Sequence, residues 1–558
     1  MKKSNLIYCI ILGLTLASCS KGGAANPYRP DIVEYSLVQV DPLVKIMKED
    51  RTVGEYVEAA DVARGETVSF QLVFKSNVPV KDVMIEPGKL ICGSYEISHG
   101  IKAFERYIRG GLHLTPAGDD AILPASDEYP DCLDETELTA VASNYKQPVW
   151  VTYKIPADAP AGDYTAEIVV SGMDAGSLFR TTAVVKAKVY DVDLPEKQSL
   201  LVTNWHVHSK IGMIGTGGNV PVFSDRYYQL MGKMANVMRD HGQNVYYINP
   251  LTDFIVCSKD GSGIYRFDFT NFDRTVEMFL QEGGLARIEG GHLAFRSGDW
   301  NSDYWVKVPG YGNKPIEAPE AKSFLSQFIP ALKAHLQDKG WWDIYMQHIG
   351  DEPAQGAVPS YIKIAQYVKS LAPDIVILDA VHSRELNGTV DVWCPQLDYF
   401  HTDYSFYKER QADGDQMWFY TCMAPRGNYA NRFLENPLIK VRLLHWINFR
   451  YGATGYLHWG FNQVWENALT NVATEGYCPA GDMFIAYPGR NKVHSSIRLE
   501  TMRDGICDYE LLNLLASKNS EKAMEIARSI VLNFNVYNTD PDVFREARRT
   551  LLKALEQY

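Results

Sequence analysis

Two carboxylates stand side by side in the stretch "YMQHIGDEPAQG", residues 345–356, where Asp351 and Glu352 lie between Gly350 and Pro353. Consecutive side chains of a regular strand point to opposite faces, so a site that uses both carboxylates needs a break in the strand. We expect Gly350 to let the backbone leave the regular pleat and Pro353 to end the strand. Both side chains could then face one site.

A close pair of carboxyl groups does not readily carry two charges, because each charge raises the pKa of the other group. At neutral pH one carboxyl is expected to be ionised and the other protonated, which places an acid beside an anion. Glycosidases usually hold two carboxylates on opposite sides of the scissile bond, roughly 5 Å apart or more. Adjacent residues would lie on one side of the sugar. This favours a reaction in which the 2-acetamido group of the substrate is the nucleophile.

The chain around this pair alternates between strand-like and helical patterns. Eight apolar runs predict strands at 200–207, 244–250, 285–295, 342–350, 374–383, 390–396, 416–425 and 453–463, and helical patterns cover 225–240, 319–338, 358–371 and 437–450. This alternation predicts a (β/α)8 TIM-like barrel over residues 196–490. An open, doubly wound sheet would give the same alternation, but no Gly-rich phosphate turn follows the first strand.

Functional residues of such a barrel gather where the strands end. The candidates for substrate binding at those positions are Asn204, Trp205, His206, Asn249, His348, His382, Trp393, Tyr420, Trp459 and Asn462. Aromatic rings, amides and imidazoles suit a neutral ligand with a ring and hydroxyl groups. Any one of the Trp side chains could equally fill the barrel interior.

The regions on either side of the barrel have different patterns. Residues 31–195 contain alternating apolar and polar runs such as "TVSFQLVFKS" and "GDYTAEIVVSG", which predict a β-sandwich. Residues 491–558 are helical by period. Within that helical segment, we interpret the charged residues of "RDGICDYE" as a structural ion-pair cluster; they are Arg503, Asp504, Asp508 and Glu510.

The N-terminus has the pattern of an export signal. Met-Lys-Lys precedes the apolar stretch "LIYCIILGLTLA", and the following "LASCSKGG" resembles a bacterial lipobox with Cys19 as the lipidated residue. We therefore expect residues 1–18 to be a signal peptide and 19–30 a tether. The protein would be exported and anchored to the outer membrane through a lipid at Cys19, facing the periplasm or the cell surface. An ordinary secretory signal with an incidental cysteine is the alternative.

Composition and residue spacing argue against nucleic acid and metal ions as partners. The net charge is −13 and no Lys/Arg cluster is present, which argues against nucleic acid. The cysteines are scattered without a Cys-x-x-Cys motif, and no second His/Asp pair matches the spacing of His348 and Asp351. Neither pattern predicts a metal site.

Three separated blocks carry a resemblance to a known family. "HIGDEP", "VRLLHWINFRYGATGYLHWGFNQ" and "SIRLETMRDGICDYELL" resemble glycoside hydrolase family 123, the β-N-acetylgalactosaminidases, over about residues 200–515. The resemblance implies that Glu352 is the general acid/base and that Asp351 stabilises the acetamido nucleophile and the oxazolinium intermediate. It implies no metal or organic cofactor. By analogy with other substrate-assisted hexosaminidases, Tyr420 would bond the acetamido carbonyl, and Trp459 or Trp393 would form the sugar platform.

The resulting expectation is a retaining exo-glycosidase that hydrolyses terminal β-linked N-acetylgalactosamine from glycans or glycosphingolipids. Two alternatives stay open at this point. One is a non-catalytic, glycan-binding surface lipoprotein. The other is a glycosidase with a nucleophile of its own, for which Asp379 is the only candidate.

Overall fold

The computed structural model describes residues 30–558, apart from 31, 51–53, 57, 111–120, 124–125, 137, 216–219, 467 and 470–477. The predicted signal peptide, Cys19 and nearly all of the predicted tether lie outside the described residues. Among the helices within these ranges, none is both long and apolar enough to cross a membrane. None of the seven cysteines in the described part forms a disulfide.

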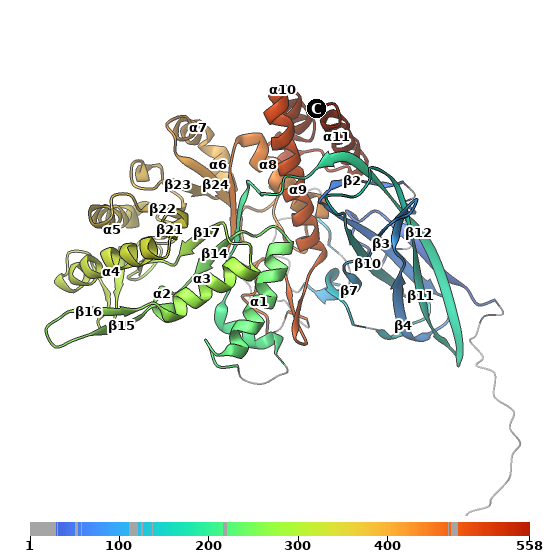
Figure 1. Ribbon diagram of the computed structural model, residues 1–558, viewed down its shortest axis with the longest axis horizontal. Coiled ribbons are helices and arrows are strands. Elements are labelled where there is room, and N and C mark those ends of the chain that lie inside the picture. The colour runs from blue at the N-terminus through green and yellow to red at the C-terminus, as the bar shows by residue number, and fades with distance from the viewer. Residues whose placement is uncertain are drawn as a thin grey trace, which may run out of the picture.

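The N-terminal region is built from two β-sheets (Figure 1). The first has the strand order β1-β3-β10-β7-β8, and the second has the order β2-β12-β11-β4-β9, with β5 and β6 beside β11. The strands are β1 Tyr35–Val40, β2 Ala60–Arg64, β3 Thr67–Ser76, β4 Val80–Pro87, β5 Leu90–Cys92, β6 Tyr95–Ile97, β7 Lys102–Arg109, β8 Glu128–Asp134, β9 Leu138–Val141, β10 Lys146–Lys154, β11 Gly162–Asp174 and β12 Ser177–Asp193.

Both sheets contribute side chains to one hydrophobic core. In the antiparallel ladder between β3 and β10, Leu72 lies opposite Val149, and both are fully buried. Ile85 of β4 and Ile168 of β11 reach the same core from the second sheet. The alternation in the sequence thus places one face of each strand in the core, and the region is a sheet-rich domain as predicted.

Eight parallel strands follow and form a nearly closed barrel with the strand order β13-β25-β24-β23-β22-β21-β17-β14. They are β13 Leu201–Asn204, β14 Val245–Ile248, β17 Arg287–Gly290, β21 Tyr345–Gln347, β22 Val376–Val381, β23 Val392–Pro395, β24 Gln416–Tyr420 and β25 Gly455–His458. Each lies within one of the eight predicted runs. Because the strands are parallel, their carboxyl ends meet at one mouth.

The junction between β13 and β14 is held by side chains in place of a strand ladder. The backbone N–H of Val202 donates to Oδ1 of Asn244 at 2.9 Å, and Nδ2 of Asn204 donates to Oε1 of Gln243 at 3.2 Å. The first bond satisfies a backbone N–H that a ladder would otherwise pair. Both bonds join the two end strands of the sheet.

Helices surround the barrel, and three of the four predicted ones have the predicted bounds. The helices are α1 Asp225–Asp240, α2 Leu251–Phe254, α3 Thr270–Glu282, α4 Pro319–Asp338, α5 Val358–Leu371, α6 Leu397–Thr402, α7 Tyr404–Ala412, α8 Leu438–Tyr451, α9 Ile497–Lys518, α10 Ser520–Ile530 and α11 Pro541–Leu555. Helix α1 illustrates the local signals: the Ser224 side chain caps its first turn, and its apolar stripe is buried against the barrel.

The strict (β/α)8 repeat is wrong at one position. Between β22 and β23 all residues are described, and they contain only the short 3-10 helix Arg384–Leu386 in place of an α-helix. The connection has about ten residues, which is short for an α-helix with its two turns. After β25, α9 packs against α8, so the predicted helical tail begins with a helix of the barrel layer.

Short antiparallel strands extend the loops at the mouth and the C-terminus. They are β15 Val256–Lys259 with β16 Tyr265–Asp268, β18 Ala294–Arg296 with β19 Tyr304–Val308 and β20 Gly312–Lys314, β26 Tyr487–Gly489 with β27 Lys492–His494, and β28 Val531–Asn533 with β29 Val536–Tyr537. The β18–β20 sheet lies in the loop after β17 and brings residues to the site.

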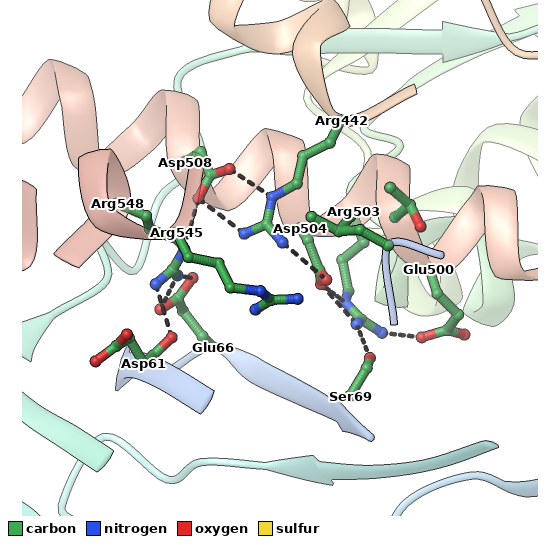
Figure 2. Close-up of polar contacts among 12 residues, drawn as sticks. Asp61, Glu66, Ser69, Arg442, Glu500, Arg503, Asp504, Asp508, Arg545 and Arg548 are labelled. Atoms are coloured by element: carbon green, nitrogen blue, oxygen red, sulfur yellow. Dashed lines mark hydrogen bonds and ion pairs between the residues drawn. The ribbon is translucent and has the colours of Figure 1, made fainter. Parts of the chain in front are cut away.

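A buried ion-pair network fixes the sheet domain to the C-terminal helices (Figure 2). Arg548 of α11 donates to both carboxylate oxygens of Glu66 and, at 2.9 Å, to Asp508. Asp508 also pairs with Arg442 at 2.7 Å, and Arg503 donates to the Ser69 hydroxyl at 3.0 Å. The predicted ion pairs are therefore confirmed for Arg503, Asp504 and Asp508, whose partners come from both domains. The carboxylate of Glu510 is structural in another way, because it accepts hydrogen bonds from Ser199 and from the backbone N–H of Leu200.

Candidate active site

The adjacent carboxylates lie in the loop that follows β21. Glu352 has a φ of +53°, the left-handed region that a non-glycine residue seldom adopts. Its backbone N–H donates to the carbonyl of Ala380 at 3.1 Å, and its carbonyl accepts from Arg296 at 2.7 Å. These two bonds hold the turn. Because the backbone is not extended here, the two side chains do not follow the alternation of a strand.

Gly350 is required for a different reason from the predicted one. Its φ is not positive, but a Cβ at this position would lie 2.5 Å from the ring of Tyr304. The Tyr304 hydroxyl donates to the carbonyl oxygen of Asp351. Close packing of an aromatic ring against the backbone therefore shapes the loop. The strand itself already ends at Gln347, well before Pro353.

Glu352 is held by side chains from neighbouring strands. Oε1 of Glu352 accepts the hydroxyl hydrogen of Tyr420, and Nε2 of His382 lies 3.5 Å from the same oxygen. Nε2 of Gln396, which can only donate, lies 3.3 Å from the Tyr420 hydroxyl oxygen. Nε2 of His382 also contacts this hydroxyl, whose hydrogen is donated to Glu352. A proton carried by Glu352 must lie on its other oxygen, Oε2.

These contacts divide the charge of the pair. Burial would raise the pKa of Glu352, but the bonds and charge of His382 and the bond from Tyr420 outweigh burial and lower it. Burial, followed by repulsion from Glu352, raises the pKa of Asp351 to about 8. At neutral pH the free protein thus holds one proton on the pair, and that proton resides on Asp351.

Asp351 faces a cavity of about 500 Å³ at the mouth of the barrel. Its carboxyl oxygens accept no hydrogen bond from any side chain or backbone group in the described part of the chain. Glu352 lies outside the lining of this cavity. The two carboxyl groups therefore differ in surroundings: Asp351 is open to a ligand in the cavity, and Glu352 is held beside it.

A charged network lies below the cavity. The imidazole of His348 is fully buried, with Nδ1 2.6 Å from Asp379 and Nε2 2.7 Å from Glu289. Burial would lower the pKa of His348, but the two carboxylates outweigh burial and raise it to about 10. Glu289 also accepts the indole N–H of Trp205 at 2.7 Å, which fixes that ring in the cavity wall.

His292, His348 and Asp379 have ligand atoms within 4.8 Å of one another, so their spacing could accommodate a metal ion. Both ring nitrogens of His348, however, are engaged by carboxylates, and a metal would have to displace a proton from a strongly basic imidazole. We interpret this cluster as a hydrogen-bonded ion network that supports the cavity.

The structure brings six of the ten predicted binding residues to the cavity or to its supporting shell. Trp205, His206 and Asn249 line the cavity. His348 lies in the charged network, and His382 and Tyr420 contact Glu352. Trp205 stacks on Tyr247 with ring centroids 4.3 Å apart.

Three other predicted binding residues, Asn204, Trp393 and Asn462, have side chains that already contact the protein itself. The Asn204 amide is committed to the β13–β14 junction and to Arg432. Trp393 is fully buried against the helix layer, where it packs on Tyr407 of α7. Asn462 is fully buried and bonds both backbone groups of Val207. In each case the polar or aromatic group already has a protein partner.

Trp459 lies at the mouth but outside the cavity lining. Its indole N–H donates to Asp482 at 2.9 Å, and its side chain remains partly exposed. Gln463, which does line the cavity, donates to the Trp459 carbonyl. Its predicted role as a sugar platform stays a prediction.

Sequence analysis did not single out four residues that define the site: Tyr247, Glu289, Arg296 and Tyr304. Glu289 had a signal, because it is the one acidic residue in the predicted strand run 285–295. Arg296 and Tyr304 come from the small sheet inserted after β17. Nothing in their local pattern indicates where that sheet folds.

Two family models match this chain. A family model described as glycoside hydrolase 123, catalytic domain, matches residues 214–515, and one described as glycoside hydrolase 123 N-terminal domain matches residues 47–172. None of the curated protein sequences matches the chain.

Among solved structures, the chain is similar to a family 123 glycoside hydrolase from Clostridium perfringens, analysed for glycolipid glycan hydrolysis. The TM-score is 0.72 at 16% identity, covering 94% of this chain and 97% of that one. A β-glucuronidase from Parabacteroides merdae matches at 10% identity, covering 81% of this chain and 51% of its own. Its TM-score of 0.29 is too low to indicate a shared overall fold. The first comparison supports the whole two-domain fold.

Proposed function

This chain belongs to glycoside hydrolase family 123, and from that premise we propose that it is a retaining exo-glycosidase that releases terminal β-linked N-acetylgalactosamine by substrate-assisted catalysis. One observation carries the proposal. Asp351 faces the cavity with no hydrogen-bond partner among the described residues, while the adjacent Glu352 is held by Tyr420. Such a pair can serve two different atoms on the same side of one sugar.

In the first step, the acetamido oxygen attacks the anomeric carbon as the bond to the leaving oxygen breaks. Glu352 gives its proton to that oxygen, and Asp351 accepts a hydrogen bond from the acetamido N–H. In the second step, Glu352 removes a proton from water, which opens the oxazolinium with retention of configuration. The pair loses its proton to the leaving group in the first step and regains one from water in the second.

The free protein holds this proton on Asp351, so substrate must move it to Glu352. A hydrogen bond donated to a carboxylate favours the ionised form. The acetamido N–H would therefore favour charge on Asp351 and leave the proton for Glu352. Below the pair, the positive charge of His348 lowers the pKa of Asp351 and supports the same state.

A glycosidase with its own nucleophile fits this site less well. The only candidate from the sequence, Asp379, is fully buried and bonds His348, Tyr361 and the backbone N–H of Ile349. A sugar could not reach it without the loss of these bonds.

The natural substrate and location are also proposals. The Clostridium perfringens relative was analysed for glycolipid glycan hydrolysis, which makes a glycosphingolipid glycan a reasonable substrate here. A lipid anchor at Cys19 would place the enzyme at the outer membrane, where such glycans arrive from outside the cell.

The test compares 4-nitrophenyl N-acetyl-β-galactosaminide with the corresponding 2-hydroxy galactoside. We expect release from the first and almost none from the second, because the nucleophile is then absent. An N-acetylgalactosamine-derived thiazoline should inhibit competitively. Equal cleavage of both substrates, or a covalent sugar on a carboxylate of the enzyme, would restore the enzyme-nucleophile alternative. No release from any aryl N-acetylhexosaminide would favour a glycan-binding protein.

A further inference from the structure

A row of aromatic rings lies beside Glu352 and outside the lining of the cavity, and its two end members are exposed. The row, which we name the aromatic rim, consists of Trp300, His382 and Tyr399. Trp300 is 46% exposed and Tyr399 is 38% exposed. The ring centroids of Trp300 and His382 are 6.0 Å apart, and His382 stacks on Tyr399 at 4.6 Å.

Two chains of contacts connect the rim to Glu352. Arg296 donates to the carbonyl oxygens of both Glu352 and Trp300, and its guanidinium lies 3.9 Å from the centre of the Trp300 ring. At the other end, His382 lies 3.5 Å from Oε1 of Glu352. An exposed Trp side chain is thus fixed relative to the carboxyl group by a cation–π contact and hydrogen bonds.

The positions of the two carboxyl groups define the direction of a bound substrate. Asp351 lines the cavity, so the sugar that carries the acetamido group occupies the cavity. Glu352 must face the oxygen of the bond that breaks. The part of the substrate beyond that oxygen therefore extends from Glu352 toward the aromatic rim.

We propose that the aromatic rim is the binding subsite for the first sugar of the leaving group, with Trp300 as its stacking platform. This inference rests on the proposed function. The apolar face of a pyranose packs well on an indole, and the ring is held in place before binding, which reduces the entropy lost. The loop that carries Trp300 would then set preference for the aglycone, separately from the cavity that recognises the N-acetyl sugar.

The experiment compares two substrates with the same N-acetylgalactosaminyl group. One is a disaccharide in which this sugar is β-linked to galactose, and the other is the glycosyl fluoride, whose leaving group has no ring. For Trp300→Ala we expect kcat/KM for the disaccharide to fall about tenfold, with a much smaller change for the fluoride. Trp300→Phe should recover part of the loss, because it retains an aromatic face.

Trp342→Ala serves as a matched control, since Trp342 is also partly exposed but bonds Asp374 at the opposite end of the barrel. Tyr399→Ala provides a second test that does not alter the Trp300 loop. If kcat/KM of both rim variants falls equally for the two substrates, or falls for neither, the inference is wrong while the proposed function stands. If the wild-type protein hydrolyses neither substrate, the proposed function fails and the subsite with it.

Discussion

Replacing Tyr420 by phenylalanine removes one hydroxyl group from the site and leaves its ring. In the structure this hydroxyl donates to Oε1 of Glu352 and is approached by Nε2 of Gln396 and of His382. The bond from Tyr420 is one of the contacts that lower the pKa of Glu352. Its removal should raise that pKa.

The size of the change follows from the kind of bond. A hydrogen bond to a charged group contributes about 1.5–3 kcal/mol, and about 1.4 kcal/mol corresponds to one pH unit. His382, with Nε2 3.5 Å from the same oxygen, can replace part of the lost bond. We therefore expect the pKa of Glu352 to rise by about one pH unit.

The pH dependence of kcat/KM separates the two carboxyl groups, because it reports the free enzyme. The active pair carries one proton. Activity falls at low pH when Glu352 also becomes protonated, and it falls at high pH as Asp351 ionises near pH 8. Tyr420→Phe should move the acid limb up by about one pH unit. The alkaline limb should stay, since Glu352 is ionised on both sides of that transition.

The assay measures release from 4-nitrophenyl N-acetyl-β-galactosaminide between about pH 3 and 10 for the wild type, Tyr420→Phe and a control. Tyr246→Phe is the control, because its buried hydroxyl bonds the carbonyl of Gly283 on the far side of β14. An acid limb that does not move, or an alkaline limb that moves in its place, would refute the assigned charges of the pair.

Three further predictions concern catalysis, stability and export. Glu352→Gln should reduce turnover of a substrate with a sugar leaving group by roughly 10²-fold or more and reduce turnover of a nitrophenyl substrate much less. Asp351→Asn should slow both substrates by similar factors. The measurement is the ratio of wild-type to variant rate for each substrate, and it tests the different roles of the two carboxyl groups. Arg548→Met should lower the free energy of unfolding by about 3–5 kcal/mol, because it leaves the buried carboxylate of Glu66 without its ion-pair partner. Arg180→Met, which removes an exposed pair, should change the free energy of unfolding by less than about 1 kcal/mol in the same thermal or denaturant titration. Cys19→Ala should abolish metabolic lipid labelling and release active protein; retained labelling would exclude Cys19 as the lipidated residue.

The sequence by itself determined the barrel strands and singled out the adjacent carboxylates. All eight barrel strands lie in the predicted runs, because helical and strand periods differ and are visible locally. The adjacency of Asp351 and Glu352 is likewise local, and it was enough to predict that the two carboxyl groups carry unequal charge. These conclusions need no knowledge of how distant segments meet.

Only the tertiary structure decided which face each barrel side chain occupies. In a parallel barrel both faces of a strand are buried, one in the barrel and one under helices, so the sequence lacks the polar alternation that marks the outside. Trp205 consequently lies in the cavity wall, while Trp393, an equally plausible candidate, packs against the helices. Tyr420 meets Glu352 from 68 residues away, and such a meeting depends on the closure of the barrel, which no local pattern specifies.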